Sequence, residues 1–244
     1  MGSWVHLTDW SLPSNVKAAY TTRLGGGSAD PYDSFNLATH VGDDPQKVLK
    51  NREYLSSSLA MPSDPRWLKQ VHSDKVVRWP PRLITPEADA IYANLKSAVC
   101  AVLTADCLPI LIASLNGEEI AAIHAGWRGL FNGVINQAIN EFSAAPDELT
   151  VWLGPRISQA RYEVGLDLID KFTAADKRYE AAIQQVNNHY FLDLAEIALS
   201  QLQQKGVEAV HDCRLCTFEQ EADFFSYRRD GITGRFASLI WRFE

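Results

Sequence analysis

Three residues of metal-binding type follow apolar segments in the middle of the chain. His72 lies in WLKQVHSD, Cys107 in TADCLPIL and His124 in AAIHAGWRG. Separations of 35 and 17 residues are too wide for a local zinc knuckle, but they suit a site that folding assembles from three strand ends. Two imidazoles and one thiolate are a good zinc ligand set, and three protein ligands leave a fourth position for water or substrate. Such a metal lowers the pKa of bound water toward neutrality and generates a hydroxide nucleophile.

Each of these residues also has a simpler interpretation. A lone cysteine in an apolar strand usually packs as a small hydrophobic residue, and a lone histidine at a strand end is usually just hydrogen-bonded. Cys107 could instead be a nucleophile with His72 or His124 as its base. Asp106, beside Cys107, is a candidate to orient a metal ligand or to make an ordinary strand-end hydrogen bond.

Arginines and a glycine turn provide candidates for an anion site. Guanidinium groups bind phosphate oxygens through paired hydrogen bonds. Arg228 and Arg229 follow two phenylalanines and a tyrosine in a segment that we expect to be a strand, so at least one of them should point inward. The glycines at 25–27 could present N–H groups to an anion, although a tight turn is their commoner role. The arginine candidates are Arg23, Arg128, Arg228, Arg229 and Arg235.

The FNLATHVGD segment adds Asn36 and His40 as candidate contacts to a ribose or base, or as turn and helix-capping residues. Cys213 and Cys216 form a CxxC pair, but no second pair completes a four-cysteine zinc site and no thioredoxin-like context surrounds it. We therefore expect this pair to pack near the site.

The elements that must position these residues are short strands and a few helices. A helix is expected to start at Asp44-Pro45, because Asp is a good N-cap and Pro suits the first turn. A second helix is expected at 131–142 and a third between Asp193 and Gly206. Asn116-Gly117 predicts a type I′ hairpin. Strands are expected at 16–23, 67–71, 75–79, 98–103, 108–114, 119–124, 150–153 and 235–243. This pattern favours a single α+β domain, 1–244, with a mixed sheet or sandwich core and helices packed outside.

Composition limits the classes of partner. The chain has 244 residues, 46% of them hydrophobic, four cysteines and a formal charge of −7. A nucleic-acid binder usually carries a basic face, which this balance does not suggest. Four cysteines are too few for a disulfide scaffold. The N-terminal residues lack the features of a secretory signal, and the longest apolar stretch, 98–115, contains Asp106 and Pro109. We expect a cytoplasmic monomer or small homo-oligomer without a membrane or nucleic-acid partner.

Longer motifs resemble the laccase-domain family, also called the multicopper polyphenol oxidase or peptidoglycan editing factor family. The resemblance spans about 19–241, with the motifs in the family's order, and implies the laccase-domain (cysteine-hydrolase-like) fold. It also implies zinc coordination by His72, Cys107 and His124. Ser73 stands where the family usually has Gly, and its small side chain should leave the loop intact. The motifs are TTRLGGGS, YDSFNLATHVGDD, WLKQVHSD, ADAIYAN, LTADCLPIL, AAIHAGWRGL, LGPRISQARYEVG and FFSYRRDGITGRFASLIW.

The resemblance implies several activities. Family members are described as copper phenol oxidases, as zinc-dependent purine nucleoside enzymes and as editors of peptidoglycan precursors. An ordinary multicopper oxidase needs many histidines, often in His-x-His pairs, whereas this chain has six histidines and no such pair. We therefore expect a zinc enzyme that takes a purine nucleoside and phosphate. The expected reactions are phosphorolysis of adenosine, guanosine, inosine and methylthioadenosine, and adenosine deamination. An amide hydrolase, a copper-dependent oxidase and a metal-stabilised binding domain are the alternatives.

Overall fold

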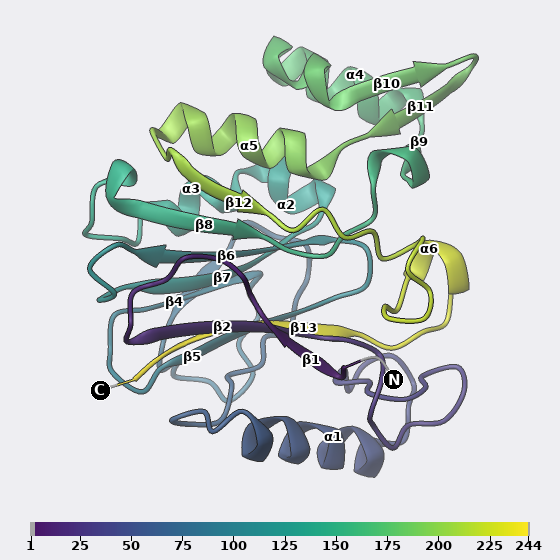
Figure 1. The fold of residues 1–244 in the computed structure, drawn as a ribbon. Coiled ribbons are helices and arrows are strands. Elements are labelled where there is room, and N and C mark those ends of the chain that lie inside the picture. The colour runs from purple at the N-terminus through teal and green to yellow at the C-terminus, as the bar shows by residue number, and fades with distance from the viewer. Residues whose placement is uncertain (1–2, 244) are drawn as a thin grey trace.

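Two β-sheets packed face to face form the centre of the molecule (Figure 1). The computed structural model describes residues 3–243. The larger sheet has the order β12-β8-β6-β7-β4-β3; its outer pairs β12/β8 and β3/β4 are parallel and the others antiparallel. The smaller, antiparallel sheet has the order β1-β2-β13-β5. The strands of the larger sheet are β3 (Val76–Arg78), β4 (Ala90–Ala93), β6 (Leu108–Ser114), β7 (Ile120–Ala125), β8 (Leu149–Leu153) and β12 (Ala209–Asp212). Those of the smaller sheet are β1 (Val5–Leu7), β2 (Val16–Thr21), β5 (Val99–Thr104) and β13 (Phe236–Arg242).

Helices cover the outer faces of both sheets. In Figure 1, α2 (Trp127–Asn132), α3 (Val134–Ile139) and α5 (Leu194–Lys205) lie over the six-stranded sheet, and α1 (Pro45–Ser58) lies on the far side of the four-stranded sheet. Beyond α5 are α4 (Leu166–Ala175) and a small sheet of β9 (Glu163–Val164), β10 (Ile183–Val186) and β11 (His189–Leu192). This arrangement confirms the predicted α+β class with a mixed-sheet sandwich and external helices.

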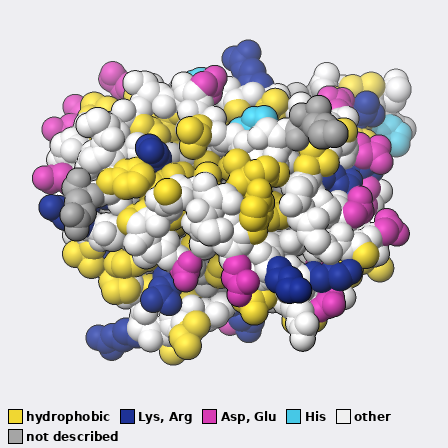
Figure 2. All heavy atoms as spheres, turned by 60° about the horizontal axis from the view of Figure 1, so that its bottom comes forward, with side chains coloured by type: hydrophobic (Ala, Val, Ile, Leu, Met, Phe, Trp, Pro, Cys, Tyr) yellow, Lys and Arg dark blue, Asp and Glu magenta, His cyan; other side chains and the backbone are white. Residues whose placement is uncertain are grey.

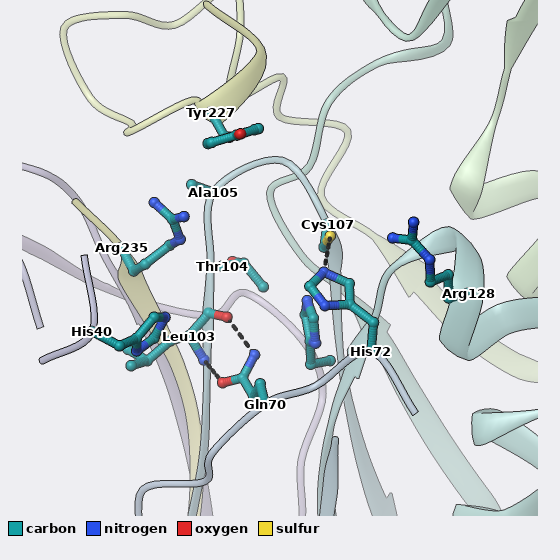
Figure 3. A pocket seen from close by; sticks show the side chains of 11 residues that line it. His40, Gln70, His72, Leu103, Thr104, Ala105, Cys107, Arg128, Tyr227 and Arg235 are labelled. Atoms are coloured by element: carbon teal, nitrogen blue, oxygen red, sulfur yellow. Dashed lines mark hydrogen bonds between the residues drawn. The ribbon is translucent and has the colours of Figure 1, made fainter. Parts of the chain in front are cut away.

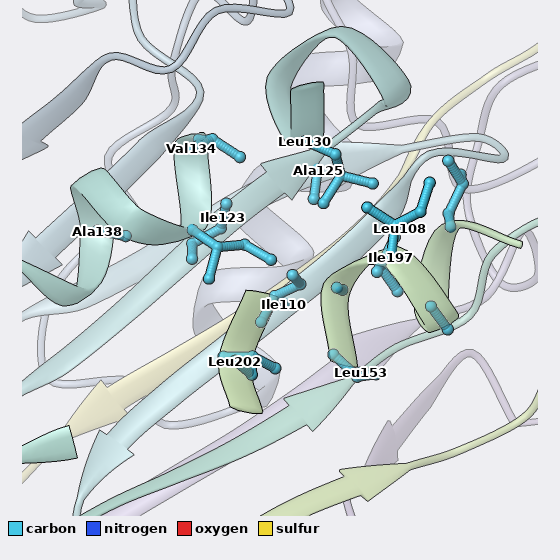
Figure 4. Packing of buried hydrophobic residues seen from close by; sticks show 14 of the residues in the cluster. Leu108, Ile110, Ile123, Ala125, Leu130, Val134, Ala138, Leu153, Ile197 and Leu202 are labelled. Carbon is cyan, nitrogen blue, oxygen red and sulfur yellow. The ribbon is translucent and has the colours of Figure 1, made fainter. Parts of the chain in front are cut away.

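Alternation along β6 explains why the layers pack as they do. Side chains of a strand point in turn to opposite faces of its sheet. Ile110 and Ile112 belong to the core cluster beneath the helices (Figure 4), whereas Leu111 and Ala113 belong to the cluster between the two sheets. Every residue of β6 is buried, as expected for a strand covered on both faces.

Most of the predicted elements are present. Strand β6 has the predicted bounds, and β5, β7, β8 and β13 each differ from their predicted ranges by a residue or so at an end. Asp44 caps α1 by accepting a hydrogen bond from the Gln46 amide, and Asp193 caps α5, which ends at Gly206 with φ +86°.

Four local predictions are wrong. Residues 67–71 do not form a strand and make only isolated bridges, such as Lys69 to Glu87. The helix expected at 131–142 is split into α2 and α3, because Gly133 adopts φ +91° and interrupts the helical backbone. The β6–β7 hairpin is present, but Asn116 lacks the positive φ that a type I′ turn requires, and only Gly117 of this turn has one. The strand expected before Gly231 is the short helix α6 (Tyr227–Asp230).

The surface mixes charge and apolar groups. On the face shown in Figure 2, Lys and Arg side chains are interspersed with Asp and Glu, with apolar side chains between them. Within residues 3–243, no helix combines the length and apolar character needed to cross a membrane.

Candidate metal centre

Strand pairing brings His72, Cys107 and His124 together. His124 lies in β7 opposite Pro109 of β6, so Cys107, directly before β6, is adjacent to it. The loop after residues 67–71 adds His72, whose Nε2 is 3.9 Å from the Cys107 Sγ. Donor atoms of the three residues all lie within 4.8 Å of one another, and Figure 3 shows His72 and Cys107 facing one another. A contraction of about 1 Å would place three donors at zinc-binding distances.

A carboxylate that the sequence analysis did not single out orients both histidines. Asp89, directly before β4, is fully buried. Its Oδ1 accepts hydrogen bonds from the His124 Nδ1 at 2.8 Å and from the His72 amide at 3.0 Å. Its Oδ2 accepts from the amide and hydroxyl of Ser73, at 2.6 and 2.8 Å. Because a carboxylate only accepts, the His124 Nδ1 carries a proton, and Nε2 is the ring nitrogen that could bind a metal once its own proton is released.

The electrostatics of the cluster favour the thiolate. Burial raises the pKa of the Cys107 thiol, but the charge of His124 and hydrogen bonds from both histidines outweigh it and lower this pKa to about 6. Burial lowers the pKa of His124, whereas Cys107 and Asp89 together raise it to about 9. Burial likewise opposes ionisation of Asp89, but its hydrogen bonds lower its pKa to about 2. A thiolate is the form of cysteine that binds metals.

Backbone geometry leaves room for an ion beside these donors. His72 and Asp106 both have left-handed backbone conformations, with φ of +60° and +94°, which non-glycine residues seldom adopt. Gly126, directly after β7, faces the cluster: a Cβ there would lie 3.0 Å from the Cys107 Sγ and 3.0 Å from the His72 Cδ2. Strained residues of this kind are typical of functional sites. The donor set and its surroundings fit a zinc or copper ion.

A cavity of about 350 Å³ opens beside the cluster. In Figure 3, Arg235 and Tyr227 lie on one side of it and Arg128 on the other. Arg235 donates from Nη1 to the carbonyls of Thr233 and Gly234, both at 2.9 Å, so its position is fixed. The His40 pKa is lowered by burial and then by the positive charges of Arg235 and Arg52, which keeps this imidazole neutral. The lining residues are His40, Gln70, His72, Leu103, Thr104, Ala105, Cys107, His124, Arg128, Tyr227 and Arg235.

Three of the five candidate arginines lie outside this lining. Arg23 forms an ion pair with Asp33 at 3.2 Å. Arg229 donates to the carbonyls of Thr217, Phe218 and Phe224 and to the Asp230 carboxylate, so it holds the chain around α6 together. Arg228 lies over the Tyr162 ring at 5.0 Å and donates to the Glu163 carbonyl. Only Arg128 and Arg235 of the five line the cavity.

Two other candidates have architectural contacts. The Asn36 side chain is buried and bonds both the amide and the carbonyl of Ala38, together with the Asp43 carboxylate, which is the capping interpretation. Asp106 contacts no ligand histidine: its carboxylate accepts from the Thr217 hydroxyl at 2.7 Å and the Arg228 amide at 2.6 Å. The carboxylate that orients a ligand is therefore Asp89 rather than Asp106.

The CxxC pair is not a disulfide, since Cys213 and Cys216 are both free thiols. Cys216 is buried and its Sγ donates to the Ser158 hydroxyl at 3.1 Å, whereas Cys213 packs against the core between the sheets. Both observations match the packing role expected for them.

Sequence reasoning missed Asp89 and Tyr227 as site residues. Asp89 stands between two alanines in ADAIYAN, directly before an apolar strand, and an acid in such a position is a usable signal. Tyr227 was noted only as part of a strand, whereas the helical turn of α6 places its ring, 61% exposed, at the cavity.

Comparison with known proteins places this site in a family. Residues 17–243 match the family model described as multi-copper polyphenol oxidoreductase laccase. The chain is 42% identical over 236 residues to a purine nucleoside phosphorylase of Haemophilus influenzae, covering 96% of this chain and 97% of the relative. It is 43% identical over 233 residues to purine nucleoside phosphorylase YfiH of Escherichia coli K12, covering 95% and 96%.

Solved structures give the same assignment. A crystal structure of a Neisseria meningitidis protein superposes with a TM-score of 0.94 at 40% identity, covering 99% of this chain and all of that one. YlmD from Geobacillus stearothermophilus gives a TM-score of 0.86 at 29% identity, with 95% and 93% covered. With its motifs, fold and relatives in agreement, the chain belongs to the multi-copper polyphenol oxidoreductase laccase family.

Proposed function

We propose that this protein is a zinc-dependent purine nucleoside phosphorylase. The observation that carries the proposal is a cluster of three metal-binding side chains facing a cavity that two arginines also line. Three protein ligands leave a coordination position for substrate, and the arginines supply charge for phosphate. The names of the relatives at 42% and 43% identity support this activity over phenol oxidation.

The cavity offers a separate place for each part of the substrates. The exposed ring of Tyr227 is a stacking surface for a purine, and aromatic pairs of this kind favour offset stacking. Arg128 and Arg235 are suited to hold the phosphate. The neutral imidazole of His40 can donate a hydrogen bond from one nitrogen and accept with the other, which suits a ribose hydroxyl.

In phosphorolysis, a phosphate oxygen forms a bond to C1′ of the ribose. The glycosidic C–N bond breaks, and the purine leaves with its electron pair and takes up the proton that the attacking hydrogen phosphate gives up. Arg128 and Arg235 hold the phosphate near the reacting carbon and offset its charge, a positioning effect that can contribute several kcal/mol. When bound, the metal supplies a Lewis acid that polarises an oxygen of the substrate.

We propose inosine, guanosine, adenosine and methylthioadenosine as substrates, since the stacking surface is common to all purines. Adenosine deamination is proposed as a second reaction of the same cavity. It consumes water in place of phosphate, so it does not need the arginines for a reactant.

The test uses purified protein of measured zinc and copper content, incubated with each nucleoside with and without phosphate. Chromatography should detect free base only when phosphate is present, and inosine from adenosine in either case. Chelator treatment should abolish both reactions, and zinc should restore them. Absence of base release from fully metallated protein would contradict the proposal and favour the amide hydrolase.

A further inference from the structure

A second polar cavity lies at the opposite ends of the strands that hold the metal centre. Strands β4, β6, β7 and β13 each have one end near His124, Cys107, Asp89 or Arg235. Their other ends, with the turn between β6 and β7, line a cavity of about 550 Å³. Strands β6, β7 and β13 have six or seven residues, so the two cavities are roughly 20 Å apart. The lining residues are Asn94, Lys96, Asn116, Glu118, Glu119, Ser143, Ala144, Glu148 and Arg242.

Arg242 is the lining residue that suggests a ligand for this cavity. The residue is only 6% exposed, at the end of β13. Within residues 3–243, its guanidinium group makes no ion pair or hydrogen bond, and its Nε is buried without an acceptor. A buried guanidinium normally has several hydrogen-bond partners, because leaving a charged donor unpaired is costly. Its five donors in a planar fork match a planar, bidentate acceptor.

The acidic residues nearby do not fill this role. Glu119 is buried, but its carboxylate already accepts from the Tyr92 hydroxyl at 2.5 Å and from the amides of Ser143 and Ala144 at 2.8 and 2.9 Å. Glu148 accepts from the Ala145 amide at 3.0 Å. Glu118 accepts from the side-chain Nδ2 of Asn116 at 3.4 Å. Glu118 and Glu119 are near enough for their charges to attract the guanidinium, but neither makes a hydrogen bond or ion pair with it within residues 3–243.

The same acids select the ligand. Arg242 and Lys96 contribute two positive charges to the lining, and the three glutamates contribute three negative ones. The three carboxylates repel a doubly charged phosphate more strongly than a singly charged carboxylate, and the planar carboxylate matches the fork of Arg242. We propose that this cavity is a second binding site, separate from the metal centre, for the carboxylate group of a small organic acid or amino acid. Lys96, exposed at the rim, adds long-range attraction.

Thermal unfolding of the full-length protein tests this site with sodium acetate, glycine and sodium phosphate as probes, against sodium chloride at equal ionic strength. A carboxylate at about ten times its Kd should raise the Tm by roughly 3–5 °C. In Arg242→Met, the rise in Tm that comes from a probe bound at this cavity should be lost. Any rise in Tm that comes from a probe bound at the metal centre should remain. Arg242→Met also removes a positive charge that Glu118 and Glu119 attract, so its melting temperature without a probe is the reference for its own probe shifts.

Two further variants serve as comparisons for this test. Lys96→Gln changes an exposed residue, so it should fold normally and show a smaller acetate or glycine shift. Lys205→Gln, a half-buried lysine at the end of α5 that does not line this cavity, should respond like the wild type. A glycine shift exceeding the acetate shift would identify an amino acid as the favoured source of the carboxylate, and the reverse order a simple acid. Equal shifts in the wild type and Arg242→Met, or a phosphate shift larger than both, would overturn the proposal.

Discussion

Buried charged side chains at the two ends of strands β4, β6, β7 and β13 differ in how fully they are hydrogen-bonded. At the metal end, the buried Asp89 carboxylate accepts five hydrogen bonds, four of them from residues 71–73 and one from His124. At the hairpin end, the guanidinium of Arg242 has no partner within residues 3–243. The protein therefore fixes the Asp89 carboxylate before anything binds. At the hairpin end it satisfies the buried Glu119 carboxylate but leaves Arg242, within residues 3–243, without a hydrogen-bond partner.

The two ends also differ in which residues have a left-handed backbone conformation. Left-handed backbone at His72 and Asp106 occurs at the metal end, where the surrounding hydrogen bonds can hold strained residues in place. Left-handed backbone also occurs at the hairpin end, at Gly117 and at Ser97 beside the lining residue Lys96, but the candidate metal ligands lie only at the metal end. Substitutions at the metal end should therefore change metal affinity and activity far more than substitutions at the hairpin end.

Removal of the thiolate should have the largest effect. Cys107→Ala deletes one of three ligands, so we expect loss of bound metal and a fall in kcat/KM for phosphorolysis of at least about 1000-fold. The free energy of unfolding should fall by only about 1–2 kcal/mol. Metal analysis, kinetics and denaturant unfolding measure the three quantities.

Cys100→Ala is the matched control, because Cys100 is a fully buried thiol in β5 without a donor partner at the site. It should lose some stability and keep its metal and activity. Wild-type turnover in Cys107→Ala would make that residue an ordinary core cysteine.

Loss of the Asp89 charge should have the next largest effect. Asp89→Asn keeps the size of the side chain but weakens its hold on the His124 imidazole and the His72 backbone. Substitution of such a partner typically costs 10- to 100-fold in metal affinity, which chelator competition can measure. Glu87→Gln, an exposed carboxylate paired with Lys69, should bind metal normally. Unchanged affinity in Asp89→Asn would mean that the ligands hold their geometry without it.

The arginines test whether the metal end also binds phosphate. Arg128→Gln and Arg235→Gln should each raise the KM for phosphate by about 10- to 100-fold, because a hydrogen bond to a charged group contributes about 1.5–3 kcal/mol. Deamination of adenosine should fall less, since phosphate is absent from that reaction. Arg161→Gln, which breaks an exposed pair with Glu219, serves as the control. Equal losses in both reactions would remove these arginines from the phosphate role.

A small pH effect should come from His40. Burial and the nearby arginines lower its pKa in the folded protein, so protonation favours the unfolded chain and stability is lost as pH falls below the usual histidine value. Between pH 7 and pH 5 the Tm of the wild type should therefore decrease more steeply than that of His40→Gln. Thermal unfolding across this range measures the difference, and parallel curves would show that His40 contributes nothing to it.

The sequence was sufficient to predict the features that depend on hydrophobic periodicity, capping residues and residue type. The apolar strand at 108–114 and the Asp193-to-Gly206 helix follow from local pattern and capping, and both match the structure closely. The three ligand candidates were recognisable from residue type together with the family resemblance. The positions of Asp89 and of the Tyr227 ring at the site depend on which strands pair and on the helical turn of α6. Local sequence carries little information about such long-range geometry.

The arginines illustrate the same limit. Arg229 lies in the same motif as Arg228, yet its donors are taken by three backbone carbonyls of nearby segments. Arg235 lies six residues later and lines the cavity. Motif membership cannot distinguish an arginine that binds the chain from one that faces a cavity, because the difference is decided by which carbonyls the fold brings within reach.

The three-residue connection 105–107 has a mechanical consequence. It leaves β5 in the four-stranded sheet and enters β6 in the six-stranded sheet, so Cys107 sits where the two layers of the sandwich are joined. His124 belongs to the second layer alone, through β7. An ion shared by Cys107 and His124 would therefore tie the end of this connection to β7, the neighbouring strand of the six-stranded sheet, and so fix the point at which the chain passes from one layer to the other.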